Sequence, residues 1–190
     1  MASDTGWLKD YIRDIPDFPK PGVTFKDITP LLADAAAFAG AVDALCESFA
    51  NLGVDKVLGI EARGFIVAAP VAYKLGAGFV PVRKGGKLPW QVEKQEYALE
   101  YGTDRLEIHR DAVSPGERAV IVDDVMATGG TAAAAVRLVE ALGASVAGMG
   151  FVLELGFLNG RSRLQGHDPV VLVSYGAPSE PVAAARGRGE

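Results

Sequence analysis

The feature that most constrains the fold of this chain is a strand, loop and helix pattern that runs from Arg118 to Thr131. Residues Ala119 to Val122 form a short, nearly all-apolar and β-branched run, which is typical of a strand buried on both faces of a parallel sheet. Asp123 and Asp124 are expected to end this strand. After Thr131, an alanine-rich segment with apolar residues at steps of three predicts a helix.

The loop of this pattern has the composition of a binding loop. In open α/β sheets, ligands bind beyond the carboxyl ends of the parallel strands. Four loop residues can offer backbone N–H groups and hydroxyls to a phosphate monoester at the positive end of a helix: Thr128, Gly129, Gly130 and Thr131. The two adjacent carboxylates can accept hydrogen bonds from a vicinal diol or hold a hydrated Mg²⁺. A sugar phosphate fits both halves, and the alternative is an ordinary turn with capping aspartates.

The segment from Val120 to Thr131 resembles the phosphoribosyl pyrophosphate (PRPP) signature of the type I phosphoribosyltransferases. It contains neither a Walker loop nor the Gly-x-Gly-x-x-Gly dinucleotide fingerprint. The resemblance implies that Asp123 and Asp124 bind the ribose hydroxyls and that the loop from Ala127 to Thr131 holds the 5′-phosphate. It also implies the fold of that family, which is α/β with a mainly parallel central sheet flanked by helices, a small N-terminal hood and a flexible lid hairpin.

Composition bounds the remaining possibilities. With 190 residues, of which 49% are hydrophobic, the chain is expected to form a single phosphoribosyltransferase domain over residues 1–190. The net charge of −5 argues against a nucleic-acid or membrane partner. The single cysteine, Cys46, excludes an intrachain disulfide and is expected in the core. The sequence shows neither a signal-peptide pattern nor an apolar run of about 18 residues, so a cytoplasmic location is expected.

The N-terminal part is expected to be a hood segment over residues 1–33. Apolar residues between Trp7 and Ile15 follow helical spacing, which predicts a short amphipathic helix. The proline-rich stretch after it is too broken for a regular element and is expected to be a packed loop. Asp34 or Thr29 is expected to cap a helix that runs to about Leu52.

A second strand, loop and helix pattern starts at Lys56. A strand over Lys56 to Ile60 and a helix to about Leu75 enclose a loop that contains Glu61 and Arg63. Arg63 should then lie at the carboxyl edge of the sheet, on the same side as Asp123. The alternative is that Glu61 and Arg63 form a local surface ion pair. The resemblance implies a cis peptide between Glu61 and Ala62 that directs backbone N–H groups at pyrophosphate.

A basic cluster follows the next expected strand, from Gly78 to Val82. Arg83, Lys84 and Lys87 surround two glycines, and such a cluster can be a solvated turn or can neutralise a pyrophosphate leaving group. Residues 85–105 have glycines at both ends, which is typical of a lid that excludes water. Further strands are expected at 105–108, 146–155 and 170–175, and a frayed tail at 179–190.

Three further segments resemble the adenine-specific branch of the family, at residues 17–30, 63–65 and 83–89, the last followed by 99–102. This resemblance implies that adenine is transferred to PRPP with Mg²⁺ as cofactor, giving AMP and pyrophosphate. The metal would be bound mainly through PRPP, with a water-mediated contact to Asp123 and Asp124 left open. A homodimer is also implied.

The resemblance gives each matching position a role. Pyrophosphate would be bound by Arg63, Arg83, Lys84 and Lys87. Adenine would be contacted by Thr24, Phe25 and Lys26. Glu100 would exchange a proton near N7 of adenine, and Tyr101 would close over the site. These roles come from the family, because a hairpin acid such as Glu100 has no distinguishing pattern of its own.

Two other functions stay open. One is a phosphoribosyltransferase for another base, namely hypoxanthine, xanthine or orotate, against which the hood and the segment Leu99 to Gly102 argue. The other is a regulator that uses the fold to sense PRPP. Such regulators carry a separate DNA-binding domain, for which 190 residues with a net charge of −5 leave no room.

Overall fold

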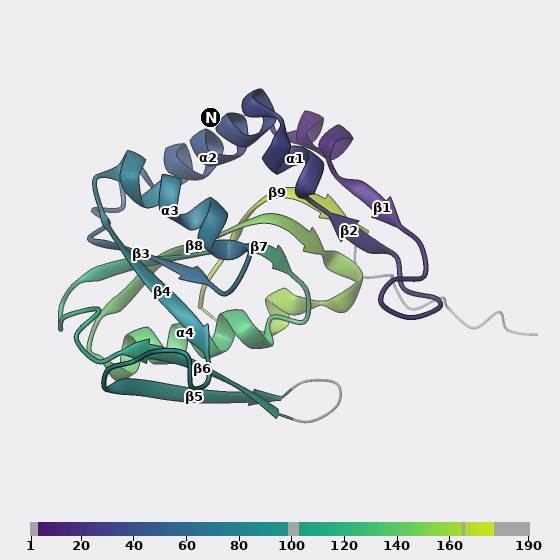
Figure 1. Ribbon diagram of the computed structural model, residues 1–190. Coiled ribbons are helices and arrows are strands. Elements are labelled where there is room, and N and C mark those ends of the chain that lie inside the picture. Colours follow the sequence, from purple (N-terminus) through teal and green to yellow (C-terminus); the bar gives the residue numbers. More distant parts are fainter. Residues whose placement is uncertain (1–3, 99–102, 165, 177–190) are drawn as a thin grey trace, which may run out of the picture.

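The computed structural model describes residues 4–98, 103–164 and 166–176. Within this part of the chain, a seven-stranded sheet has the strand order β5-β6-β4-β3-β7-β8-β9 (Figure 1). Its strands are β3 (Lys56–Ile60), β4 (Gly78–Lys84), β5 (Val92–Ala98), β6 (Thr103–His109), β7 (Arg118–Met126), β8 (Ser145–Leu155) and β9 (Val170–Tyr175). All pairings are parallel except those of β6, which runs antiparallel to β4 and to β5. The predicted mainly parallel α/β sheet is confirmed.

Helices cover both faces of this sheet. The bounds are α1 (Thr29–Ala33), α2 (Ala35–Phe49), α3 (Gly64–Leu75) and α4 (Gly130–Ala141). Figure 1 shows α2 and α3 on one face and α4 on the other. Because side chains alternate along a strand, Val120 and Val122 of β7 pack toward α2 and α3, whereas Ala119 and Ile121 pack toward α4. The continuous apolar run of β7 is therefore buried on both sides, as expected.

The N-terminal segment departs from the prediction. The expected helix over Trp7 to Ile15 is wrong in its second half, because a 3₁₀ helix, η1 (Gly6–Tyr11), is followed by a strand, β1 (Arg13–Ile15). The stretch expected to lack regular structure contains β2 (Phe25–Asp27), which pairs antiparallel with β1. The sequence spacing could not show this, because the two short strands are stabilised by each other.

Charged side chains fix this two-stranded ribbon. Arg13 Nη2 lies 2.7 Å from Asp27 Oδ2, and Lys26 Nζ lies 2.7 Å from Asp14 Oδ1. Hydrogen bonds from Arg13 and from Thr29 lower the pKa of Asp27. These pairs join residues on opposite strands, so they supply the register that a local pattern does not contain.

One helix was expected here, capped by Asp34 or Thr29, and the structure has two, of which Asp34 caps the longer. Thr29 begins α1, and Asp34 caps α2, since its Oδ1 accepts hydrogen bonds from the N–H groups of Ala36 at 3.0 Å and Ala37 at 2.9 Å. The helix ends at Phe49, earlier than the expected Leu52. Cys46 lies buried on α2, as predicted.

The expectation that Asp123 and Asp124 end their strand is wrong. Strand β7 continues to Met126 because β8 pairs with it as far as Glu154, whereas its pairing with β3 stops at Val122. The two aspartates therefore lie on a strand that has lost one neighbour. The loop between the end of β3 and the start of α3 lies beside β7 at this point.

The expected lid corresponds to the hairpin of β5 and β6. Its base belongs to the sheet, since Arg83 and Lys84 of β4 pair with Glu107 and Leu106 of β6. The hairpin strands span 92–109, so they begin later and end later than the predicted 85–105. Residues 99–102, at the tip, and the expected tail at 179–190 lie outside the described residues. None of the helices in the described part of the chain could cross a membrane.

Candidate active site

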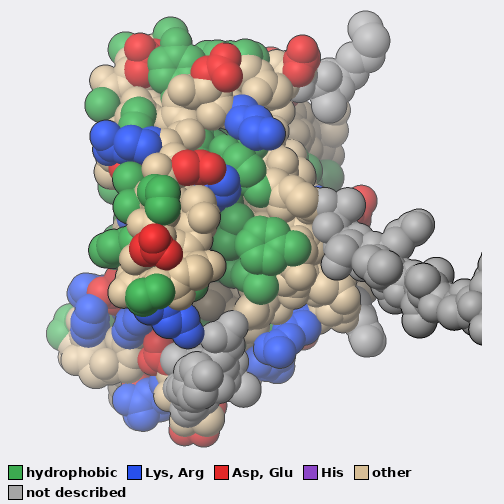
Figure 2. Space-filling model, turned by 90° about the vertical axis from the view of Figure 1, so that its right-hand side faces the viewer, with side chains coloured by type: hydrophobic (Ala, Val, Ile, Leu, Met, Phe, Trp, Pro, Cys, Tyr) green, Lys and Arg blue, Asp and Glu red, His purple; other side chains and the backbone are tan. Residues whose placement is uncertain are grey.

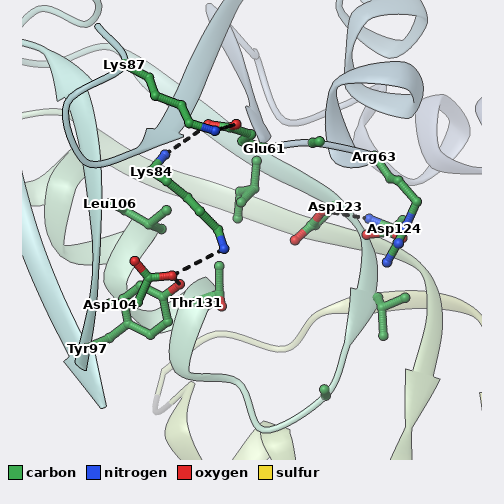
Figure 3. A pocket seen from close by; sticks show the side chains of 14 residues that line it. Glu61, Arg63, Lys84, Lys87, Tyr97, Asp104, Leu106, Asp123, Asp124 and Thr131 are labelled. Carbon is green, nitrogen blue, oxygen red and sulfur yellow. Dashed lines mark hydrogen bonds and ion pairs between the residues drawn. The ribbon is translucent and has the colours of Figure 1, made fainter. Parts of the chain in front are cut away.

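A cavity of about 600 Å³ lies where the carboxyl ends of β3 and β7 meet the hairpin (Figure 3). It brings together cations from two loops, the aspartate pair and the start of α4. The predicted site residues that line it are Arg63, Lys84, Lys87, Asp123, Asp124, Ala127 and Thr131. A smaller cavity of about 60 Å³ adjoins the loop after β7 and is lined by Thr128 and Gly129, among others.

The face that carries these elements is mixed in character. Figure 2 shows groups of Lys and Arg side chains around the hollowed lower part of this face, with hydrophobic side chains across its middle. Because the chain as a whole is acidic, with a net charge of −5, a basic lining has to be assembled locally from residues of different loops.

Asp124 is buried and Asp123 is half-buried, and neighbouring groups fix the positions of both side chains. The side chain of Asp124 is 8% exposed, and its carboxylate accepts a hydrogen bond from Arg63 Nε. The backbone N–H of Asp124 donates to Asp123 Oδ1 at 2.9 Å. Burial, together with the neighbouring Asp124 carboxylate, raises the pKa of Asp123 well above its ordinary value. The pair presents oxygen acceptors to the cavity.

Gly64 allows α3 to approach this pair. A Cβ atom at Gly64 would lie 2.4 Å from Asp123 Oδ1 and 3.2 Å from its Cα. Such distances are too short for any side chain, so only glycine fits between the two elements. Gly64 therefore allows the start of α3 to lie close to Asp123 of β7.

Glu61 and Arg63 do not form the surface ion pair that was the alternative reading of this loop. Arg63 pairs with Asp124 instead, while Glu61 faces the basic cluster. Figure 3 shows the two side chains directed to opposite sides of the loop. The peptide bond between Glu61 and Ala62 is cis, as the family resemblance implied.

The basic cluster is ion-paired rather than freely solvated. Glu61 accepts hydrogen bonds from Arg83 Nε at 3.2 Å, from the backbone N–H of Lys84 at 3.1 Å and from Lys87 Nζ. Burial alone would raise the pKa of Glu61, but these hydrogen bonds lower it to about 2. Lys84 and Lys87 line the cavity themselves, whereas Arg83 contacts Glu61, which lines it.

The loop after β7 packs backbone against backbone. Gly129, at the N-cap of α4, has a φ of 76°, and a Cβ there would lie 2.3 Å from the carbonyl oxygen of Gly160. A Cβ at Gly160 would lie 2.3 Å from the carbonyl oxygen of Ala127. Since glycine brings no side chain to the N-cap, the N–H groups of the first turn stay available to an anion.

The opposing segment is anchored by an ion pair. It is the 3₁₀ helix η3 (Gly160–Arg163), and Arg161 Nε lies 3.0 Å from Oε1 of the buried Glu154. Arg161 Nη1 also lies 2.9 Å from Asp168 Oδ1. The contact of Gly160 with the loop after β7 was not predicted, because Gly160 is distant in sequence and follows no recognisable motif.

The structure places only one of the predicted base-contacting residues near Arg63 in the part of the chain that it describes. Phe25 reaches the site, since the Arg63 guanidinium carbon lies 5.4 Å from its ring centroid. Lys26, the next residue on β2, pairs with Asp14 and lies 4.1 Å from the ring centroid of Tyr175. Thr24 is exposed. Glu100 and Tyr101 lie outside the described residues.

Sequence reasoning missed the two polar residues that the hairpin contributes to the cavity wall. Tyr97 of β5 and Asp104 of β6 are cross-strand partners, and the Tyr97 hydroxyl donates to Asp104 Oδ2 at 3.1 Å. Lys84 Nζ lies 3.4 Å from the same carboxylate oxygen. Burial raises the pKa of Tyr97. Pairing the two halves of the hairpin around residues 99–102 could have found this pair, since it places 97 opposite 104.

The residues present fit a magnesium ion that is bound mostly by a substrate. Within the described ranges, no group of three or more His, Cys, Asp or Glu side chains is arranged to hold a metal. Mg²⁺ commonly uses one or two carboxylates, waters and substrate phosphates, and Asp123 and Asp124 can supply such carboxylates directly or through water.

Comparisons with known proteins agree with the geometry. The family described as "Phosphoribosyl transferase domain" matches residues 25–167. A protein of Acidothermus cellulolyticus named adenine phosphoribosyltransferase is 62% identical over 81% of this chain and 87% of its own. Another of that name, from Desulfitobacterium hafniense, is 58% identical over 87% of this chain and 95% of its own.

Solved structures lead to the same family. A crystal structure of adenine phosphoribosyltransferase from Thermoanaerobacter pseudethanolicus matches with a TM-score of 0.86 and 53% identity, over 89% of this chain and 98% of that one. The Saccharomyces cerevisiae enzyme, solved with adenine and an imino-altritol bisphosphate, matches with a TM-score of 0.82 and 42% identity, over 90% and 98%. On its sequence motifs, fold and relatives, the chain belongs to the phosphoribosyltransferase family and, within it, to the adenine phosphoribosyltransferases.

Proposed function

We propose that this protein transfers the 5-phosphoribosyl group of PRPP to adenine and releases AMP and pyrophosphate, as in purine salvage. The observation that carries the proposal is the single cavity that joins a carboxylate pair, a phosphate-type loop and three cations at the carboxyl edge of the sheet. Relatives named for this activity, at 58–62% identity, support the choice of adenine as the base.

The segment formed by β7, the loop after it and α4 holds the ribose 5-phosphate. Asp123 and Asp124 accept hydrogen bonds from the two ribose hydroxyls and place negative charge near C1′ as it becomes cationic. The loop from Ala127 to Thr131 binds the 5′-phosphate through backbone N–H groups at the start of α4 and through its hydroxyls. Gly129 and Gly160, in close contact, fix the shape of this loop.

The loop between β3 and α3, which carries Arg63, and the basic cluster bind the pyrophosphate. Arg63, Lys84 and Lys87 line the same cavity, and Arg83 adjoins it through Glu61. As the bond between C1′ and pyrophosphate breaks, negative charge grows on the leaving oxygen. Cations already positioned there stabilise that charge without reorganisation. Mg²⁺, when bound with PRPP, supplies further positive charge to the phosphates.

The hood and the hairpin tip close over the base. Phe25 offers an aromatic face next to Arg63, and Thr24 and Lys26 complete the base-contacting segment. As N9 of adenine bonds to C1′ and the bond from C1′ to pyrophosphate breaks, the imidazole ring of adenine gives up one proton, which Glu100 accepts at N7 and returns in the reverse reaction. Tyr101 covers the site. These assignments rest on the family resemblance, and a general acid or base of this kind contributes about 10²–10⁴-fold to the rate.

The protein is further proposed to act as a homodimer in the cytoplasm. Three large apolar side chains lie exposed on α3 and β4, namely Ile66 at 46%, Tyr73 at 89% and Phe79 at 39%. Because α3 packs against β4, exposed apolar groups on these two elements favour contact with a second copy. Sedimentation velocity tests this, and a monomer at micromolar concentration would contradict it.

Base competition tests the function. The protein is incubated with PRPP, Mg²⁺ and equal concentrations of adenine, guanine, hypoxanthine and orotate, and the nucleotides formed are separated by chromatography. AMP is expected to be the main product. A preference for another base would contradict the choice of adenine but retain phosphoribosyl transfer, whereas binding of PRPP without nucleotide formation would favour a PRPP-sensing role.

A further inference from the structure

The most densely paired carboxylate of the cavity wall is Glu61, a residue that the proposed reaction does not use. Both of its oxygens accept hydrogen bonds: Oε2 from Arg83 Nε at 3.2 Å and from the Lys84 backbone N–H at 3.1 Å, and Oε1 from Lys87 Nζ and, at 3.5 Å, from Arg83 Nη2. Its side chain is only 10% exposed.

The sheet holds Glu61 in this position. The residue directly follows β3, and its backbone N–H donates to the carbonyl oxygen of Val82 on β4 at 3.0 Å. Arg83 and Lys84 continue β4 from that point, so the carboxylate projects into the turn that carries the cations. Arg83 Nη1 also donates to the carbonyl oxygen of Lys87 at 3.3 Å, which closes the turn around Glu61.

The donors that Glu61 uses are those a pyrophosphate group needs. A phosphate oxygen is recognised by the same guanidinium, ammonium and backbone N–H groups that bind a carboxylate. An added polyanion would meet a carboxylate with a pKa of about 2, and therefore charged at neutral pH. Like charges at close range repel, and a partly buried position screens this repulsion less than bulk water does.

We propose that Glu61 is a built-in counter-ion that competes with pyrophosphate for Arg83, Lys84 and Lys87, and thereby keeps pyrophosphate binding weak enough for product release. The inference rests on the proposed pyrophosphate role of these cations. According to this inference, the loop between β3 and α3 contacts the substrate and also lowers the affinity of the site for pyrophosphate. Arg63, whose guanidinium pairs with Asp124 instead, stays outside this competition.

A purely structural role for Glu61 makes the opposite prediction. If the carboxylate only positions the cations, its removal would loosen them and weaken pyrophosphate binding. If it competes, its removal would strengthen binding. The direction of the change in affinity therefore separates the two roles.

The test is isothermal titration calorimetry of inorganic pyrophosphate, with and without Mg²⁺, into the full chain and two variants. Glu61→Gln keeps the shape of the side chain and removes the charge, and the Kd for pyrophosphate is expected to fall by about tenfold. Asp43→Asn removes one charge from an exposed surface pair with Lys74 and should leave the Kd unchanged. Product inhibition by pyrophosphate should strengthen in Glu61→Gln by the same factor.

An unchanged or higher Kd in Glu61→Gln would overturn the inference, while leaving the proposed function intact if the parent protein binds pyrophosphate. A parent protein that does not bind pyrophosphate would overturn both. Should Glu61→Gln fail to fold, Glu61→Asp, which withdraws the carboxylate by one methylene, replaces it. A Kd below that of the parent is then expected, and a Kd equal to or above it would contradict the competition.

Discussion

Arg63 and Asp124 form an ion pair that joins the loop after β3 to strand β7: the guanidinium Nε of Arg63 donates to the carboxylate of Asp124. Asp124 is 8% exposed on its side chain and Arg63 is 45% exposed. The buried acid is therefore held by a cation that still reaches the cavity. This arrangement couples the proposed diol-binding carboxylates to the proposed pyrophosphate site.

Replacing Arg63 should affect PRPP more than adenine. Arg63→Ala removes a donor from the pyrophosphate side and leaves the Asp124 carboxylate without its partner. We expect kcat/KM for PRPP to fall by about 10²-fold, with a smaller change in the KM for adenine. Arg110→Ala is the matched control, because Arg110 is 60% exposed and pairs with Glu93 on the hairpin. Equal losses in the two variants would refute a specific role for Arg63.

The contact between Gly160 and the proposed phosphate-binding loop after β7 predicts a selective defect in ligand binding. Gly160→Ala would place a Cβ 2.3 Å from the carbonyl oxygen of Ala127, so the loop must move, at a cost of about 1–3 kcal/mol. Calorimetry should then show weaker binding of ribose 5-phosphate and little change for pyrophosphate. Gly78→Ala, whose nearest neighbours are atoms of the flexible Lys56 side chain, serves as the control. Equal weakening of ribose 5-phosphate and pyrophosphate binding would argue against a selective role of Gly160 at the loop after β7.

The pKa of Glu61 predicts a pH dependence of stability. This pKa is lowered from 4.5 to about 2 in the folded protein, so the folded state favours the ionised form. The contribution of Glu61 to stability is therefore fully present above pH 4.5 and is lost as the pH falls toward 2. Urea unfolding of the parent and of Glu61→Gln should show a difference in unfolding free energy that grows as the pH rises from 2 to 4.5 and is constant above pH 4.5. A difference independent of pH would contradict the lowered pKa.

The role proposed for Glu100 concerns the chemical step. Glu100→Gln keeps the size of the side chain but cannot exchange a proton with adenine, so kcat should fall by about 10²–10⁴-fold, while the Kd for PRPP changes little. Glu96→Gln is the control on the same hairpin. Unchanged turnover would remove Glu100 from its role.

How much the sequence could predict follows from which interactions are local. The strand from Lys56 to Ile60 and the helix start at Asp34 are encoded by contiguous apolar runs and a capping residue, and both are confirmed. The loops that form the cavity follow from the rule that parallel strands end at one edge of the sheet. Arg63 and Asp124, 61 residues apart, meet for this reason.

Features that depend on distant partners were not predictable. Strand β1 replaced a predicted helical turn because β2 supplies its hydrogen-bond partners. Asp123 and Asp124 stay within β7 because β8 is long enough to pair with them. The role of Gly160 and the direction of Glu61 depend likewise on chain segments brought together only in the fold. The spacing of apolar and polar residues along the sequence does not predict such contacts.

The most direct measurement is a stoichiometric turnover experiment. PRPP labelled in its β-phosphate is mixed with Mg²⁺, the protein and limiting adenine, and AMP and labelled pyrophosphate are quantified over time. Equal amounts of AMP and pyrophosphate are expected, with the reaction stopping when adenine is exhausted. Pyrophosphate release that continues without adenine, or no AMP at all, would contradict the proposal that this cavity transfers the phosphoribosyl group to adenine.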